Sequence, residues 1–207
     1  MWICHMLNHL KDFTFVRDAH EDIRLRLANE EDATQVIRIW KEGIKRSFQF
    51  TESSSDIPAC LQASRLNQNT SPFQIWVATQ AGNISGWISL APISEHPLKK
   101  NLAAECSIYV DQSSQGKGIG QKLVQKMLES SRCTSLQHIY AHVSPFNTGC
   151  IKLLEKNGFV SMGMLPQSGR HESPRSRCLL VIGVWLVPTS RDLSVKRRIQ
   201  TWSFCVK

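Results

Sequence analysis

The hydrophobic pattern along the chain alternates between a period of two and a period near 3.6. Ile23, Leu25 and Leu27 alternate with charged or polar residues, which predicts a strand. Asn29 and Asp32 then mark the start of a helix. Its apolar stripe comprises Ala33, Val36, Ile37, Trp40 and Ile44. The folded part of the chain is therefore expected to begin with a strand followed by an amphipathic helix.

The same two periods continue to the end of the apolar pattern. Residues 74–93, QIWVATQAGNISGWISLAPI, contain two β-rich runs around Ala81-Gly82-Asn83, which predicts a hairpin. Downstream, AAECSIYVDQ and HIYAHVS fit strands, GIGQKLVQKMLESS and NTGCIKLLEKN fit helices, and two β-like runs follow near 159–165 and 178–187. The predicted order is β-α-β-β-β-α-β-α-β-β, an α/β class, with a further helix considered within 55–68.

Composition places this pattern in one domain. A chain of 207 residues with 42% hydrophobic content can bury a core, and we assign that core to residues 22–188. Residues 1–21 form an extension without clear periodicity, and residues 189–207 form a basic tail that we interpret as solvated. The net charge of +8 favours acidic ligands such as nucleic acid, anionic membrane surfaces or a polyphosphate cofactor, without choosing among them.

The cysteines and the apolar runs indicate the cellular location of the protein. Seven cysteines, an odd number without a C-x-x-C pair or histidines at metal-ligand spacing, favour a reduced intracellular compartment and no structural metal. The opening MWICHMLNHLKDF has neither a basic leader nor a small-residue cleavage site. The run CLLVIGVWLVP is shorter than the roughly 18 residues of a membrane span. We expect a cytoplasmic protein without a membrane partner.

A glycine-rich turn joins a predicted strand to a predicted helix at Gly116, Gly118 and Gly120. Such a turn exposes unpaired backbone N–H groups at the positive end of the helix dipole, where phosphate oxygens bind, and Gln115 and Lys117 can add donors. The glycines alone also fit a plain helix start. They form neither a Walker loop nor a complete dinucleotide fingerprint.

Two separated motifs place this turn in a family context. QGKGIG fits Q/R-x-x-G-x-G/A and resembles the GNAT N-acetyltransferase superfamily. AECSIYV and the later NTGCIKLLEKNGF resemble the phosphinothricin N-acetyltransferase group, which pairs E-x-S-x-Y-V with N-x-x-S-x-x-L-H-E-K/R-x-G-F. The likeness covers about residues 22–187. It implies a central mixed, mostly antiparallel sheet, splayed after the Glu105 strand and flanked by helices.

The resemblance also implies a cosubstrate, acetyl-CoA, and no metal. The pantetheine arm would lie against backbone groups of Ile108, Tyr109 and Val110. Asn147 would contact the cofactor from a helix start, where it also suits a plain N-cap, and Lys156 would reach it from the helix end unless it is simply solvated. The pyrophosphate would be held by Gln115, Gly116, Lys117, Gly118, Ile119, Gly120 and Gln121.

The implied chemistry is direct attack of an amine on the thioester. Glu105 is the candidate to take the amine proton, directly or through water, unless it is a solvated carboxylate at a strand end. Backbone N–H groups beside Tyr109 would polarise the thioester oxygen. No covalent intermediate is required, so Cys106 and Cys150 are interpreted as buried small residues.

The chain departs from the group's pattern at three places, of which the first and the third concern the acceptor. Leu154 stands where the group commonly has histidine, and leucine cannot move a proton. Cys150 replaces a serine. The group's closing G-x-W-x-D segment is absent, so the acceptor pocket is not defined by the resemblance. Arg170 and His171 in the altered segment either face an acidic acceptor or are solvated loop residues, and the latter is the more frequent case.

Three functions of different classes remain open. The first is acetyl transfer to the primary amine of a small molecule of the amino-acid analogue class, and the second is acetylation of a protein. The third is non-catalytic acyl-CoA binding, against which the presence of Glu105 argues. Nucleic acid is the least favoured partner because the basic residues are scattered and Trp202 and Phe204 are the only aromatics among them. Dimers are common among members of the group, so the resemblance makes a homodimer one possible assembly without fixing the oligomeric state.

Overall fold

The computed structural model describes residues 23–48, 66, 71–93, 102–166 and 178–186. Within them, the predicted order of strands and helices is confirmed. The helix considered for 55–68 lies outside the described residues apart from Leu66, as do the extension, the basic tail, Arg170 and His171. The elements are β1 (Arg24–Leu27), α1 (Ala33–Phe48), β2 (Ile75–Gln80), β3 (Asn83–Pro92), β4 (Ala103–Val110), α3 (Ile119–Ser131), β5 (His138–Val143), α4 (Thr148–Lys156), β6 (Val160–Pro166) and β7 (Cys178–Trp185).

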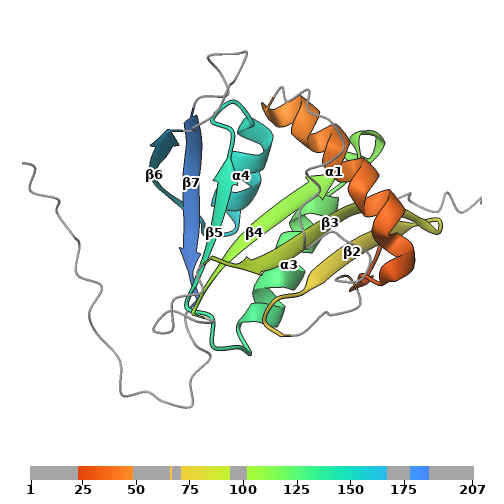
Figure 1. The fold of residues 1–207 in the computed structure, drawn as a ribbon, viewed down its shortest axis with the longest axis horizontal. Coiled ribbons are helices and arrows are strands. Elements are labelled where there is room, and N and C mark those ends of the chain that lie inside the picture. Colours follow the sequence, from red (N-terminus) through yellow and green to blue (C-terminus); the bar gives the residue numbers. More distant parts are fainter. Residues whose placement is uncertain (1–22, 49–65, 67–70, 94–101, 167–177, 187–207) are drawn as a thin grey trace, which may run out of the picture.

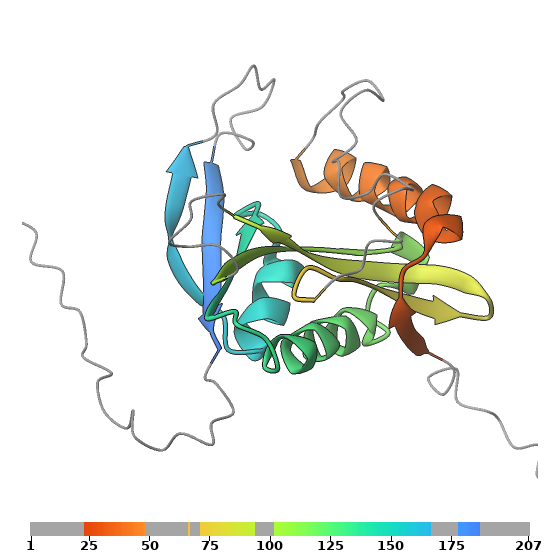
Figure 2. The same cartoon turned by 60° about the horizontal axis from the view of Figure 1, so that its bottom comes forward.

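The strands form one seven-stranded sheet in the order β1-β2-β3-β4-β5-β7-β6 (Figure 1). Only the β4–β5 pair is parallel, so the expectation of a mixed, mostly antiparallel sheet is confirmed. Helix α1 covers one face, and α3 and α4 cover the other (Figure 2). We call these the α1 face and the α3–α4 face.

The sheet splays where β4 meets β5. Their pairing joins Ala103–Glu105 to His138–Tyr140 and ends there, although β4 continues to Val110 in register with β3. Beyond Glu105 the two strands diverge (Figure 1). The predicted splay after the Glu105 strand is therefore confirmed, and it begins at Glu105 itself.

The predicted hairpin is formed by β2 and β3. Its two turn residues, Ala81 and Gly82, have φ angles of 49° and 80°. Positive φ at both central residues is typical of the tight turns whose twist matches that of the flanking strands. The short turn therefore fixes the pairing of Gln80 with Asn83 at the end of the two strands.

Both faces of the sheet carry a hydrophobic core. On the α1 face, Trp87 is almost fully buried with Val36 and Val77, and its indole N–H donates to the Val36 carbonyl at 3.1 Å. On the other face, Ala104, Cys106, Leu123, Val124, Ile139 and Phe159 belong to a larger core. Since side chains alternate along a strand, Glu105 lies between Ala104 and Cys106 but points to the α1 face.

Ion pairs hold both the segment that leads into α1 and α1 itself. Arg26 makes two contacts of 2.6 and 2.7 Å with the Asp32 carboxylate, which also accepts the Asn29 N–H at 2.8 Å. In the middle of α1, Arg38 contacts Asp111 at 2.8 Å, just after β4. Hydrogen bonds from Ser113 and Arg38 lower the pKa of Asp111. Helix α1 is thereby fixed over the C-terminal half of β4, which we call the outer half.

Leu154 occupies the core on the α3–α4 face, where it is fully buried. It therefore lies on the opposite side of the sheet from Glu105. In this chain the position just before Glu155 is a packing position, and a histidine there would place its imidazole among apolar side chains.

We expect Leu154→His to lower the free energy of unfolding by about 3 kcal/mol or more, because it removes apolar burial and buries a polar ring. Leu154→Met, which conserves volume, should cost less than about 1.5 kcal/mol. Urea denaturation of the two variants measures the difference. Equal stabilities would contradict the assignment of Leu154 to the core.

Candidate active site

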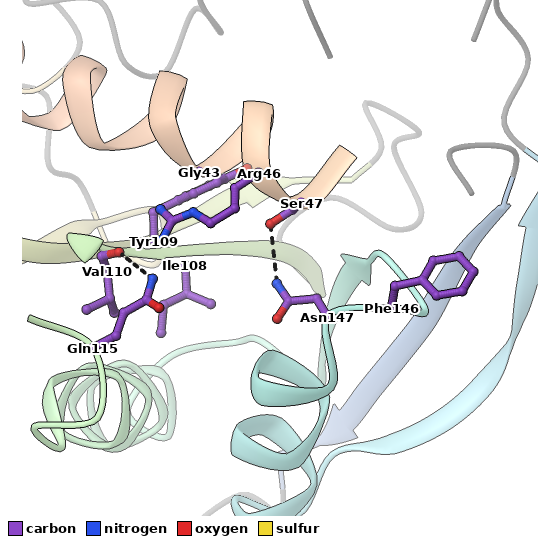
Figure 3. Close-up of a pocket in the computed structure, with 9 residues that line it drawn as sticks. All are labelled: Gly43, Arg46, Ser47, Ile108, Tyr109, Val110, Gln115, Phe146 and Asn147. Atoms are coloured by element: carbon purple, nitrogen blue, oxygen red, sulfur yellow. Dashed lines mark hydrogen bonds between the residues drawn. The ribbon is translucent and has the colours of Figure 1, made fainter. Parts of the chain in front are cut away.

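A cavity of about 280 Å³ opens where β4 has left β5 (Figure 3). It lies between the C-terminal end of α1, the outer half of β4 and the start of α4. Its lining residues are Gly43, Arg46, Ser47, Ile108, Tyr109, Val110, Gln115, Phe146 and Asn147. Five of these nine were predicted from the sequence as cofactor contacts, and the structure brings them together.

The wall contributed by β4 consists of Ile108, Tyr109 and Val110. Ile108 and Val110 pack against the core on the α3–α4 face, and the Tyr109 ring packs against Trp87 with ring centroids 5.0 Å apart. These contacts hold the strand from both sides. Because β5 pairs only as far as Glu105, the backbone edge of β4 along these three residues faces the opening between the strands.

The glycine-rich turn begins α3 as predicted. Gly118 precedes the helix with φ of 79°, and the Lys122 N–H donates to its carbonyl at 3.1 Å as the first helical bond. The backbone N–H groups of Ile119, Gly120 and Gln121 therefore have no acceptor within the helix. The first turn of α3 contains no acidic residue, so nothing there neutralises the positive end of the dipole.

The side chains around this turn differ in what they can offer a ligand. Gln115 lines the cavity and donates to the Val110 carbonyl at 3.3 Å, and Lys117 is exposed. Ile119 is buried in the core, so only its backbone can face a ligand. The Gln121 amide exchanges two hydrogen bonds with Asn157, at 2.8 and 3.1 Å, and so joins α3 to the end of α4.

Asn147 caps the N-terminus of α4 and also lines the cavity. Its Oδ1 accepts the Cys150 N–H at 3.1 Å, and its Nδ2 donates to the Ser47 hydroxyl at 3.4 Å (Figure 3). Lys156 is exposed at the other end of α4, roughly 13 Å along the helix axis from Asn147. The structure thus brings Asn147 to the cavity but does not bring Lys156 there, and a cofactor contact by Lys156 stays a prediction.

Four lining residues were missed by sequence reasoning: Gly43, Arg46, Ser47 and Phe146. Two signals for them were available in the sequence. Gly43 interrupts an otherwise apolar and charged helical pattern, and Arg46 belongs to a basic last turn of α1. The guanidinium of Arg46 adds a cation to the cavity wall, which suits an acidic ligand.

Glu105 is joined by a second side chain that sequence reasoning also missed. The Nδ1 atom of His142 on β5 lies 2.7 Å from Oε1 of Glu105. The hydrogen bond to Glu105 raises the pKa of His142, and partial burial only partly opposes this. The available signal was the alternation in HIYAHV, which places His138, Tyr140 and His142 on one face of β5.

The thiols near this region are held in their protonated form. Burial raises the pKa of Cys106, and it raises the pKa of Cys150 to about 11. Thiolate is the nucleophilic form of cysteine, so neither thiol is poised as a nucleophile. Cys106 is buried as interpreted, whereas Cys150 is only partly buried.

Two kinds of feature are absent from the described residues. In that part of the chain, no group of three or more His, Cys, Asp or Glu side chains could hold a metal ion. No described helix combines the length and apolarity needed to cross a membrane.

The sequence profile of the acetyltransferase (GNAT) family matches residues 34–159, a range that includes the cavity, the glycine-rich turn and Glu105. The chain belongs to this family. Its members' activity, acetyl transfer, is accordingly the activity class of this protein. The family membership implied by the sequence motifs is thereby confirmed.

The chain is also similar to individual proteins of known name. Within the GNAT family, the chain is 30% identical over 143 residues to YwnH of Bacillus subtilis, a protein assigned as a phosphinothricin acetyltransferase, covering 69% of this chain and 86% of YwnH. It is 35% identical over 66 residues to an L-methionine sulfoximine/L-methionine sulfone acetyltransferase of Pseudomonas aeruginosa, covering 32% and 38% of the two chains.

A solved structure shares the fold. The phosphinothricin acetyltransferase of Sinorhizobium meliloti, determined in complex with acetyl-CoA, superposes with a TM-score of 0.66 at 19% identity, over 88% of this chain and 96% of that one. At this identity the likeness concerns the fold alone. It agrees with the mixed, splayed sheet described above.

Gly43 provides a test of the cavity wall. A methyl group added there would collide with the Tyr109 ring, so we expect Gly43→Ala to destabilise by about 1–3 kcal/mol despite the better helix propensity of alanine. Gly149→Ala is the matched control, because its methyl would meet only Asn147 Oδ1 at 3.9 Å, and it should be neutral or stabilising by up to about 1 kcal/mol. Thermal unfolding compares them. Stabilisation by both substitutions would show that Tyr109 does not pack against α1.

Proposed function

We propose that this GNAT-family protein transfers an acetyl group from acetyl-CoA to the primary amine of a small molecule of the amino-acid analogue class. The observation that carries the proposal is the departure of β5 from β4 at Glu105, directly beside a cavity lined by β4, α1 and α4. This arrangement offers a backbone edge, an anion-binding helix start and a carboxylate within one region of the sheet.

Acetyl-CoA fits the groups around the cavity. Its pantetheine arm is an extended chain with two amides, which suits the backbone of Ile108, Tyr109 and Val110. Its pyrophosphate suits the N–H groups at the start of α3, with Lys117 and Arg46 as nearby cations. In this arrangement the thioester would lie toward Glu105, at the point where the strands separate.

The proposed reaction is direct attack of the amine on the thioester carbonyl. An alkyl amine is mostly protonated at neutral pH and has no free lone pair in that form, so a group in the site must take a proton from it before the nitrogen attacks. Glu105 is 40% exposed on the α1 face and lies where an acceptor would approach from the side opposite the α3–α4 core. We place Glu105 in the path of that proton.

The acceptor class is supported by the names of the relatives. YwnH and the Pseudomonas aeruginosa relative are both named for acetylation of phosphinothricin or L-methionine sulfoximine and sulfone, which are amino-acid analogues. Acetylation of a protein and non-catalytic acyl-CoA binding are the outcomes against which the proposal is tested.

Location and assembly are predictions that accompany the proposal. The four cysteines among the described residues, at 106, 133, 150 and 178, are free thiols, which agrees with a cytoplasmic location. A homodimer as the assembly also stays a prediction.

Gly118 tests where the pyrophosphate binds. An alanine at its φ of 79° costs about 1–2 kcal/mol, and we expect Gly118→Ala to weaken acetyl-CoA binding at least tenfold because the N–H groups behind it shift. Gly82→Ala in the β2–β3 turn is the matched control, since its φ is 80° and its methyl would also meet open space. Calorimetric titration should give Gly82→Ala the wild-type affinity. Equal affinities for both variants would exclude the turn as the phosphate site.

Activity is tested by CoA release from acetyl-CoA against a panel of amines that includes phosphinothricin, L-methionine sulfoximine and L-methionine sulfone. We expect acceptor-dependent turnover in the wild type and a fall in kcat/KM of at least about tenfold in Glu105→Gln, because proton transfer through correctly positioned side chains contributes about 10² to 10⁴ in rate. Acetyl-CoA binding without turnover on any small amine would favour a protein acceptor or a non-catalytic role. Unchanged turnover in Glu105→Gln would remove Glu105 from the proton path.

A further inference from the structure

Glu105 and His142 form a hydrogen-bonded pair, with Nδ1 of His142 2.7 Å from Oε1 of Glu105. A carboxylate has no proton to donate, so a carboxylate at Glu105 requires the tautomer of His142 in which the Nδ1–H donates. A neutral imidazole with its proton on Nδ1 carries a lone pair on Nε2. Among the residues that the structure describes, no hydrogen bond occupies that Nε2 atom.

The pair belongs to the face of the sheet that an acceptor would approach. Glu105 is paired with Tyr140 across the β4–β5 ladder, and His142 lies two residues further along β5, where the strands have already separated. Both side chains are partly exposed, at 40% for Glu105 and 31% for His142. The imidazole is therefore accessible from the opening between β4 and β5.

We propose that His142 is the base that accepts the amine proton, and that Glu105 is the positioning residue that holds the imidazole in the required tautomer. This inference rests on the proposed function. The bound ammonium gives one proton to Nε2 of His142, the neutral nitrogen then bonds to the thioester carbon, and the C–S bond breaks. The CoA thiolate takes the second nitrogen proton, directly or through water, and His142 returns its own proton to solvent. The Glu105 carboxylate stabilises the transient imidazolium.

Imidazole suits this task because its ordinary pKa lies near neutral pH, where proton acceptance and release are both accessible. Among the described residues on the neighbouring strand positions, no charged side chain other than Glu105 faces His142. On β5 the same face carries Tyr140 and His138, whereas the adjoining β7 positions are Val181 and Gly183. On β4 the next residue of that face is Ser107. Glu105 is thus the charged group paired with His142 within the part of the sheet that the structure describes.

The direction of the pH dependence follows from the same hydrogen bond. Only the neutral imidazole can accept a proton, so kcat/KM should rise with pH through the raised pKa of His142 and then level off. Glu105→Gln removes the carboxylate that favours the imidazolium. In that variant the rising limb should move to lower pH, with a reduced plateau.

The experiment measures kcat/KM against pH for wild type, His142→Asn, His142→Ala and Glu105→Gln, together with acetyl-CoA affinity by calorimetry. His142→Asn should lose at least about 10² in kcat/KM and its rising limb, while binding acetyl-CoA within about threefold of wild type. Added imidazole should restore part of the activity of His142→Ala but not that of a Glu105→Ala variant. His138→Asn, on the same face of β5, is the matched control and should stay within about twofold of wild type.

Several results would overturn the inference. His142→Asn with wild-type kcat/KM and an unchanged pH profile would show that Glu105 works without the histidine, and the proposed function would stand. Loss of acetyl-CoA binding in both His142 variants would assign His142 to the structure of the site instead. Absence of turnover by the wild type with any amine of the panel would overturn the proposed function, and the role of His142 with it.

Discussion

The site depends on one short parallel strand pair. The contact between β4 and β5 covers three residues and ends at Glu105, while β4 runs on beside β3 to Val110. Extending that pairing would cover the backbone edge beside the cavity and close the opening between the strands. Packing keeps the strands apart, because Ile108 and Val110 lie against the α3–α4 core and Tyr109 lies against Trp87 under α1.

Positive groups that are scattered in the sequence lie in the same region of the fold, where they can bind one acidic ligand. A net charge of +8 does not by itself select a partner. The fold brings the uncompensated start of α3, the exposed Lys117 and the cavity-lining Arg46 to the same region as the free edge of β4. A polyphosphate attached to an extended amide chain matches both features, and acetyl-CoA is a molecule of that kind.

The sequence predicted most of the fold and the part of the site that lies within continuous motifs. The strand and helix order, the hairpin at Ala81-Gly82 and the glycine-rich start of α3 follow from local periodicity and turn chemistry, which neighbouring residues determine. Arg46 and Ser47 could not be placed in this way, because they reach Asn147 only through the packing of α1 across β4. Lys156 illustrates the reverse case, since helix length carries it away from the cavity.

The residues of the proposed proton path also could not be identified from local sequence patterns. Leu154 was expected to mark a lost proton carrier, but it is a fully buried core residue on the far side of the sheet from Glu105. His142 reaches Glu105 across 37 positions of sequence, through the β4–β5 register. That register is decided by tertiary packing, so no local pattern could pair the two residues.

A crystal structure of the protein with acetyl-CoA tests the central claim most directly. The account predicts that the pantetheine arm lies along Ile108–Val110, the pyrophosphate contacts the backbone at the start of α3, and the thioester faces the Glu105–His142 pair with space for an amine nitrogen within roughly 3–3.5 Å of the carbonyl carbon. Acetyl-CoA bound outside the opening between β4 and β5, or with its thioester turned away from this pair, would contradict it.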